Sequence, residues 1–455
     1  MMSSVLSSIF FFIIALGVLI TVHEFGHFWV ARKVGVKVIR FSVGFGKPIF
    51  SWRRPNDDTE YVIAMLPLGG YVQMLDEREG DVAPADLERT FNRKSLAQRT
   101  AIVAAGPIFN FILAIAIYWL ILVIGVSGVK PIVGEVNEGS IAAAGGFQRG
   151  DVITRVGDTE TVTWGTAGMA LLDHSLDAEV VKVEVLQDGV VSRVRELDFS
   201  TPGLALERKE LLDSIGINIM RPKIPALIDK VTSGGAADKA GILSGDLLLA
   251  VDGELIEDWA GWVQKVRTNP EVTFKVELER EGRLMMIDLR PARISTKEGE
   301  IGRIGATVAY PEALFAEFNA VERYSFFAAF SAALVKTWDM SLLTLRMLGN
   351  MVVGNVSIEN LSGPISIAQY AGSSAGIGFV AFAGFLAIIS ISLGVLNLLP
   401  IPMLDGGHLF YYLIEWIKGS EVSEEVQAIG QRVGIGLLAL VMFIAFYNDI
   451  ERLVG

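Results

Sequence analysis

Two histidines and a glutamate lie close together near the end of the first apolar run of this 455-residue sequence. His23 and His27 are four positions apart, so both side chains would lie on one face of a helix, with Glu24 beside them. In this H-E-x-x-H pattern, two imidazoles can bind Zn²⁺ and the glutamate can act as the general base that activates water. The pattern therefore predicts a metal-dependent hydrolase.

A purely structural pair of histidines is the alternative explanation of the same pattern. The context makes this alternative weak, because residues 5–22 carry no charge and have the composition of a membrane span. An ionisable side chain at the centre of a bilayer costs about 2.5–3.5 kcal/mol on insertion scales and usually marks a functional position. We therefore expect His23, Glu24 and His27 to line a polar cavity and not to face lipid.

A hydrolytic zinc site usually has three protein ligands and one open position for water. The sequence has no cysteine, so histidine, aspartate and glutamate are the available ligands. Asp405 is the best candidate, because it follows an apolar run that Pro400 and Pro402 must break, and membranes tolerate broken helices only inside protein or beside a cavity. His408 is the other candidate. We favour Asp405, since a carboxylate leaves the site with one positive charge instead of two.

Apolar segments predict four membrane spans. Half of the residues are hydrophobic, the mean hydropathy is +0.47, and the net charge of −12 argues against a nucleic-acid partner. The first apolar run could be a signal peptide, but it lacks a basic leading segment and a small-residue cleavage site, so we interpret it as a retained span. The predicted spans are residues 5–31, 98–126, 376–400 and 430–447.

Lysine and arginine residues are concentrated between the first two predicted spans. Residues 32–100 are therefore expected to be cytoplasmic by the positive-inside rule. The N-terminus and residues 127–310 are then expected on the outer side. The H-E-x-x-H motif would lie near the cytoplasmic end of the first span.

Residues 312–353 form a further apolar stretch, interrupted by Lys336, Asp339 and Arg346. This stretch could be a fifth span. Asp405 can meet the histidines only if its own span also runs from outside to inside, which requires that the chain does not cross the membrane after the outer segment. We therefore predict a helix that lies in the membrane interface, with the C-terminus on the outer side.

The polar segment 127–310 contains an internal repeat with a constant offset of 95 residues. The stretch "GGAADKAGILSGDLLLAVDG" is similar to bacterial PDZ domains, and "GSIAAAGGFQRGDVITRVGD" is a looser copy. Such domains bind extended peptides or C-terminal carboxylates by strand addition, although a spacer or steric filter is the alternative. We expect PDZ-like domains at 127–212 and 213–310. The carboxylate-binding loop of the second is placed at Ile215, Gly216 and Ile217.

Two motifs together, "HEFGH" in the first span and "NLLPIPMLDGGH" in a late one, resemble the site-2 protease family of intramembrane zinc metalloproteases. The four-span plan, the inserted repeats and "NLSGPISIAQYAG" extend the resemblance over essentially the whole chain. By matching position, the resemblance implies that His23, His27 and Asp405 are the zinc ligands. It also implies that Glu24 activates the water.

The resemblance further implies residues that bind substrate. Asn397 matches an asparagine ahead of the family's LDG motif, here residues 404–406, and Pro402 lies in the same stretch. The sequences "VGFG" and "PLGGYVQM" match a membrane-re-entrant β-structure, here within residues 35–75, that pairs with an unwound substrate strand. Its candidate residues are Gly44, Gly46, Gly69, Gly70 and Tyr71.

The implied fold is a multi-span α-helical membrane protein with four spans and a membrane-re-entrant β-structure. Two tandem α+β PDZ-like domains are inserted between spans two and three. The chain would then divide into a first membrane part, two PDZ-like domains, an interfacial helix with its linker, and a second membrane part. The expected boundaries are 1–126, 127–212, 213–310, 311–375 and 376–455.

The implied activity is hydrolysis of peptide bonds in or near the membrane segments of single-span membrane proteins. Family substrates include a pre-trimmed anti-sigma factor and remnant signal peptides, which connects the family to envelope stress signalling. The expected location is the bacterial inner membrane, with both termini and the PDZ-like domains in the periplasm and the active site near the cytoplasmic side. The PDZ-like pair would exclude substrates with bulky ectodomains.

Two other functions are compatible with parts of the sequence. A membrane scaffold or chaperone could use the PDZ-like domains and retain a relic metal site, but a relic has no need of the intact base Glu24. A metal transporter fits poorly, because the chain has few spans and one compact set of ligands.

Overall fold

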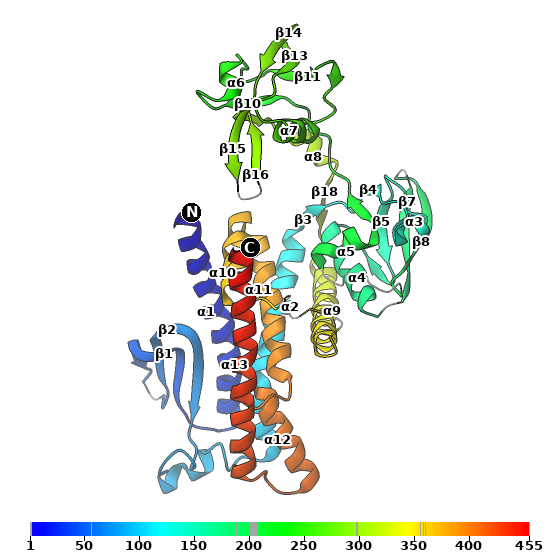
Figure 1. Ribbon diagram of the computed structural model, residues 1–455. Helices are drawn as coiled ribbons and strands as arrows, with labels where there is room; N and C mark the ends of the chain where they lie inside the picture. Colours follow the sequence, from blue (N-terminus) through cyan, green and yellow to red (C-terminus); the bar gives the residue numbers. More distant parts are fainter. Residues whose placement is uncertain are drawn as a thin grey trace.

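The computed structural model describes residues 2–454 except 56, 178, 188, 201–207, 297–298, 355, 358 and 360. Figure 1 shows a bundle of long helices, a β-hairpin on its flank, and the two repeat units toward one end of the bundle. Helix α1 (Met2–Lys33) begins and helix α13 (Glu424–Val454) ends on the side of the bundle that carries the repeat units.

Five of the described helices are long and apolar enough to cross a membrane. They are α1, α2 (Leu96–Ile124), α9 (Phe326–Val352), α11 (Phe379–Leu398) and α13. The four predicted spans fall on α1, α2, α11 and α13, so α9 is the additional candidate. Two shorter helices, α10 (Pro364–Ile377) and α12 (Asp405–Lys418), precede and follow α11.

Small side chains allow the bundle helices to approach one another closely. Ala114 of α2, Ala333 of α9 and Ala387 of α11 are fully buried in one shared cluster. A second cluster joins Leu19 of α1 to Leu386 of α11. Membrane helices associate through such close packing, because lipid chains are as apolar as the helix surfaces and provide no hydrophobic driving force.

An antiparallel β-hairpin follows α1 and lies along its flank (Figure 1). Its strands are β1 (Val38–Arg53) and β2 (Glu60–Met74), and the pairing has several register shifts. Gly44 lies at one shift with φ of 96°. A Cβ there would lie 2.9 Å from the Leu66 carbonyl oxygen, so both the dihedral and the close contact require glycine.

Short elements connect the membrane part to the repeat units. A 3₁₀ helix (Pro84–Arg89) precedes α2, and Ser95 caps α2 through a capping box with Gln98. Strand β3 (Val126–Val129) follows α2 and pairs with β18 (Asn319–Glu322), just before α9. A short helix, α8 (Glu312–Ala316), precedes β18.

The first repeat unit is built on a four-stranded sheet with the order β6-β5-β7-β8. Its core buries Trp164, Leu171 and Val183. The elements of this unit are β4 (Val133–Val136), α3 (Ile141–Ala144), β5 (Val152–Val156), β6 (Thr159–Glu160), α4 (Trp164–Leu176), β7 (Val180–Gln187), β8 (Val191–Asp198), α5 (Arg208–Ile215) and β9 (Ile217–Ile219).

The second repeat unit has a sheet of the same order, β12-β11-β13-β14. Equivalent buried aspartates form ion pairs in both units, Asp151 with Arg195 at 3.1 Å and Asp246 with Arg280 at 2.7 Å. The elements of this unit are β10 (Ile228–Val231), α6 (Ala236–Lys239), β11 (Leu247–Val251), β12 (Glu254–Leu255), α7 (Trp259–Thr268), β13 (Phe274–Arg280), β14 (Arg283–Leu289), β15 (Ala292–Thr296), β16 (Gly299–Arg303) and β17 (Ala306–Val308).

The assignment of Ile215, Gly216 and Ile217 to the second repeat unit was wrong. Strand β9 pairs with β4, and Ile215 and Ile217 are buried in the core of the first unit. The corresponding pair in the second unit is β10 with β17, preceded by Ile304 and Gly305. In each unit the last strand pairs with the first strand, β9 with β4 and β17 with β10. A constant offset between two repeats does not show which strands pair. The first unit therefore extends past the expected boundary at residue 212 to Ile219.

Helix α9 lies between the bundle and the first repeat unit (Figure 1). Ala329 and Ala333 pack against α2 and α11, whereas Leu343 packs into the core of the first unit. The guanidinium Nη1 of Arg346 lies 2.8 Å from an Asp173 carboxylate oxygen, and the pair is half-exposed. The helix therefore has both a bundle-facing and a unit-facing side.

The C-terminal end of α13 is fastened to α10 by a buried carboxylate. Asp449 is 1% exposed and accepts hydrogen bonds from the backbone N–H groups of Gly363 (3.0 Å), Ile365 (2.8 Å) and Ser366 (3.2 Å), and from the Ser366 hydroxyl. These N–H groups begin α10 and have no partner within the helix. Asp449 therefore caps one helix while belonging to another.

We expect Asp449→Ala to lower the free energy of unfolding by about 1–3 kcal/mol, because it leaves several buried N–H donors without an acceptor. Denaturant titration of the purified protein in detergent measures the change. Glu451→Ala is the matched control, since Glu451 is exposed on the same helix. Equal stability of the two variants would contradict the capping role.

Candidate metal centre

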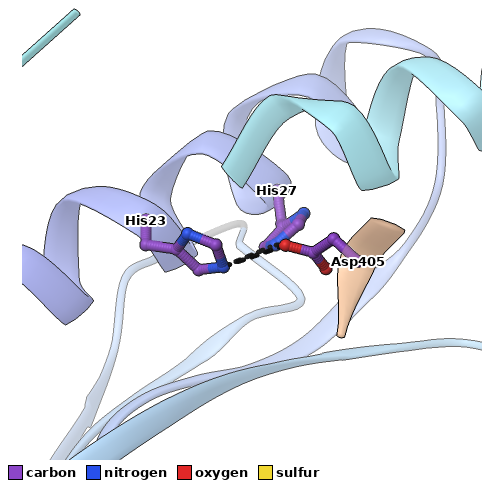
Figure 2. A group of neighbouring side chains, drawn as sticks. All are labelled: His23, His27 and Asp405. Atoms are coloured by element: carbon purple, nitrogen blue, oxygen red, sulfur yellow. Dashed lines mark hydrogen bonds and ion pairs between the residues drawn. The ribbon is translucent and has the colours of Figure 1, made fainter. Parts of the chain in front are cut away.

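Three predicted ligands meet at one point inside the bundle. Figure 2 shows His23 and His27 projecting from α1 toward Asp405, the first residue of α12. The Asp405 oxygen Oδ2 lies 3.2 Å from His23 Nε2 and 3.5 Å from His27 Nε2. The two Nε2 atoms are 3.2 Å apart. Within the part of the chain that the structure describes, this is the only group of three or more such side chains with metal-site spacing.

The spacing of these atoms fits a tetrahedral metal ion. Zinc binds imidazole nitrogen and carboxylate oxygen at about 2.0–2.1 Å, which places tetrahedral ligand atoms about 3.3–3.4 Å apart. The three observed separations are 3.2, 3.2 and 3.5 Å. The three side chains are 12–18% exposed, so the site is shielded but not sealed. The residues present therefore fit zinc.

Helix α2 orients both imidazole rings. His27 Nδ1 lies 2.8 Å from the Ile102 carbonyl oxygen, so the Nδ1–H donates there and the Nε2 lone pair faces the site. His23 Nδ1 lies 3.2 Å from the amide nitrogen Nδ2 of Asn110, which is fully buried and whose Oδ1 has no hydrogen-bond partner among the described residues. A half-turn of that amide presents its oxygen to the His23 Nδ1–H. With the amide in that orientation, His23 has the same tautomer as His27, which is the one that a metal ligand needs.

Asn110 is a residue of the candidate centre that the sequence analysis missed. Its backbone oxygen accepts a hydrogen bond from the Ser390 hydroxyl at 2.7 Å, which fixes this part of α2 to α11. The available signal was an amide side chain inside the otherwise apolar run 101–126. Polar side chains in membrane segments usually face the protein interior and often mark function.

Glycine lets α2 approach the site directly. A Cβ on Gly106 would lie 2.3 Å from His27 Nε2, a distance that no side chain can occupy without moving the ligand. At Gly26 of α1, a Cβ would lie 2.5 Å from the Ala105 carbonyl oxygen. The two helices therefore cross with their backbones almost in contact.

Asp405 is placed by a break between α11 and α12. Helix α11 ends at Leu398, and Met403 in the connecting turn has φ of 89°. A Cβ on Gly406 would lie 2.1 Å from the Leu399 carbonyl oxygen, so the turn folds back tightly on α11 only because residue 406 is glycine. The predicted break therefore occurs, and it projects the carboxylate at the start of α12.

Glu24 lies beside the ligand group without belonging to it. It interacts electrostatically with His23, His27 and Asp405, yet it is absent from the three-residue group of closely spaced ligand atoms. Strand β2 passes next to it, because a Cβ on Gly70 would lie 3.0 Å from the Glu24 Cγ. This position would suit a general base that acts on a water at the centre.

The other predicted residues fall into three places. Gly44, Gly46, Gly69, Gly70 and Tyr71 all belong to the β1–β2 hairpin, where Tyr71 stacks on Phe45 with ring centroids 6.2 Å apart. Asn397 is half-buried in the last turn of α11, and Pro402 lies in the turn before Asp405. His408 is exposed and lies outside the ligand group. Ile215, Gly216 and Ile217 lie in the first repeat unit, apart from the centre.

Comparison with known proteins shows extensive similarity. The chain is 44% identical to "Regulator of sigma E protease" of Salmonella typhi over 99% of this chain and 100% of that protein. It is 45% identical to "Regulator of sigma-E protease RseP" of Escherichia coli K12 over 97% and 98% of the two chains. A "Putative zinc metalloprotease" of Neisseria meningitidis is 43% identical over 98% of this chain and 99% of that protein.

A solved PDZ domain of an SdrC-like protein from Listeria monocytogenes covers 20% of this chain and 93% of its own, with 18% identity and a TM-score of 0.17, too low to carry an argument. The model of Peptidase family M50, by contrast, matches residues 11–441. That match spans the H-E-x-x-H helix, both repeat units and the Asp405 turn. The chain therefore belongs to peptidase family M50, the site-2 protease family, and is an intramembrane zinc metalloprotease.

Proposed function

We propose that this protease cleaves single-span membrane proteins in or near their membrane segments. The observation that carries the proposal is the position of the ligand group, which α1 and the start of α12 form inside a bundle of apolar helices. A hydrolytic centre in this place can reach only a substrate that enters the bundle. The same geometry disfavours the scaffold alternative, because Glu24 is positioned beside the ligands.

We assign the roles at the centre as follows. His23 and His27 through Nε2 and Asp405 through a carboxylate oxygen would hold zinc, which when bound supplies a Lewis-acidic position for water. Glu24 takes the proton from the attacking water and returns it to the amine that leaves. The Ile102 carbonyl keeps His27 in the required tautomer by accepting its Nδ1–H.

The β1–β2 hairpin is the proposed substrate platform. Its sheet has two strands in the described chain, so each strand has an outer edge to which a further strand can be added. Strand β2 passes Glu24 at Gly70, which would bring a paired substrate strand close to the base. Tyr71, together with Asn397 and Pro402 from the α11–α12 region, would help to hold the unwound segment.

The protein is a multi-pass membrane protein, and we propose that it has four spans in the bacterial inner membrane. The start of α1, the end of α13 and the repeat units would be periplasmic, in keeping with their place on one side of the bundle (Figure 1). Helix α9 would not cross the membrane. Arg346 near its end forms ion pairs with Asp173 and Asp177 of the first repeat unit, and such half-exposed charges belong outside the hydrocarbon layer.

The repeat units would act as PDZ-like modules that admit or exclude substrates by the size of their outer domains. Relatives named as regulators of sigma-E suggest the physiological context. We propose that the substrates are an anti-sigma factor already trimmed on its outer side and remnant signal peptides. The protease would then act in envelope stress signalling.

We expect Glu24→Gln to reduce cleavage by about 10²–10⁴-fold, because loss of a general base typically costs that much. Zinc content and thermal stability should stay at the wild-type level, since Glu24 is not a ligand. Cleavage of a single-span substrate in liposomes and metal analysis of the same sample measure both. Residual activity at a tenth of wild type would refute the assignment.

Asp405→Asn should lose activity and bind zinc more weakly, because a neutral amide is a poor ligand. His408→Ala is the matched control on the same helix and should retain zinc, since His408 lies outside the ligand group. Zinc titration of both purified variants distinguishes the candidates. The assignment fails if His408→Ala loses zinc while Asp405→Asn retains it.

Asn110→Ala should weaken zinc affinity by about 10–100-fold, because partners that orient a ligand histidine usually contribute that much. Ile112→Ala is the control, since Ile112 is on the same helix and is 50% exposed. Competition with a chromogenic chelator gives both affinities. Equal affinity of the two variants would show that Asn110 does not support His23.

A further inference from the structure

Arg99, in the first turn of α2, is a charged side chain buried inside the protein. The side chain is 8% exposed, and its Nη2 lies 2.6 Å from a carboxylate oxygen of Glu415. A second carboxylate, from Glu421, lies 3.4 Å from Nη1, and the guanidinium carbon lies 5.1 Å from the centre of the Tyr412 ring. These three partners all come from α12 or from the turn that follows it.

Helix α12 is the element that begins with Asp405. Only Gly406 and Gly407 are buried in it, whereas Trp416 and Ile417 near its end are 73% exposed. The helix is therefore fixed at its start by two glycines packed under the α11–α12 turn. Near its other end, Glu415 forms the ion pair with Arg99. Glu415 is ten residues from Asp405, or about 15 Å along the helix.

Arg99 shares one face of α2 with the three residues of that helix that contact the metal centre. Arg99, Ile102, Gly106 and Asn110 are spaced by three, four and four positions, so they lie on the same face of the helix. Ile102 and Asn110 contact the two histidines, and Gly106 makes room for them. Arg99 is the residue on this face that reaches the helix of the third ligand.

We propose that Arg99 is a positioning residue of the metal centre. Its ion pair with Glu415 fixes the position of α12 relative to α2. This position keeps the Asp405 carboxylate between the two imidazoles. One face of α2 then places all three ligands. The inference rests on the proposed ligand set, since it concerns the part of that set that comes from α12.

The buried environment makes this ion pair a geometric constraint. A guanidinium and a carboxylate that are removed from water must stay in contact, because separation leaves each charge without compensation. An apolar contact would tolerate sliding of α12 along α2, whereas a 2.6 Å charged hydrogen bond does not. Metal affinity depends on such outer contacts because they fix the ligand before the ion arrives.

The test compares Arg99→Gln, Glu415→Gln and the exchanged pair Arg99→Glu with Glu415→Arg in the full chain. Arg89→Gln is the control, because Arg89 is a half-exposed arginine that pairs with Asp58 and Asp86 and not with α12. Zinc affinity is measured by chelator competition. The visible absorption of the Co²⁺-loaded protein reports the ligand geometry. Hydrogen exchange of α12 is measured on the zinc-free protein.

Each single variant should bind zinc about 10–100-fold more weakly, lose the strong absorption of four-coordinate Co²⁺, and exchange the α12 amides faster. The exchanged pair should recover most of the affinity and the spectrum, and the control should behave as wild type. Glu415→Gln keeps a side chain of the same size that can still accept a hydrogen bond. If Arg99→Gln fails to fold, the same measurements on Glu415→Gln therefore decide the test.

The inference would be overturned if the folded single variants had wild-type zinc affinity and a wild-type Co²⁺ spectrum and differed only in a lower melting temperature. The ion pair would then serve stability alone. Failure of the exchanged pair to recover would also overturn it. Asp405→Asn in the same titration separates this result from the proposed function. If that variant loses zinc while Arg99→Gln retains it, the positioning role fails and the ligand assignment stands.

Discussion

The structure depends on the burial of two imidazoles and a carboxylate among apolar helices. Each of these groups is costly to place in a bilayer by itself, and the cost falls when they surround a dication that compensates the charge. The separations of 3.2–3.5 Å between their atoms bring the three together around one point. The helix break before Asp405 and the glycines around it follow from this requirement, because an unbroken helix could not direct the carboxylate to the histidines.

Helix α2 supplies the support that the ligands themselves lack. It contributes no ligand, yet the Ile102 carbonyl, Gly106 and Asn110 lie against the two imidazoles along one of its faces. Backbone-to-backbone contact at Gly26 makes this possible, since any side chain there would separate α1 from α2. The centre is therefore held by packing between helices, and the chemistry of the site and the fold of the bundle share the same contacts.

The first repeat unit packs on the bundle through α9. One side of this helix packs on α2 and α11, and the other packs into the first repeat unit and forms ion pairs with it. Part of the apolar surface of this helix therefore faces protein. The contacts of α9 therefore fix the first repeat unit against the bundle that surrounds the metal centre.

The sequence by itself determined the features that depend on local spacing. Helical periodicity placed His23 and His27 on one face, hydropathy located α1, α2, α11 and α13, and the prolines marked the break before Asp405. Only the tertiary structure decided which distant groups meet: Asn110 with His23, Arg99 with Glu415, and β9 with β4. The physical reason is that such contacts are set by how helices and strands pack, and neither periodicity nor composition records the partner of a buried polar group.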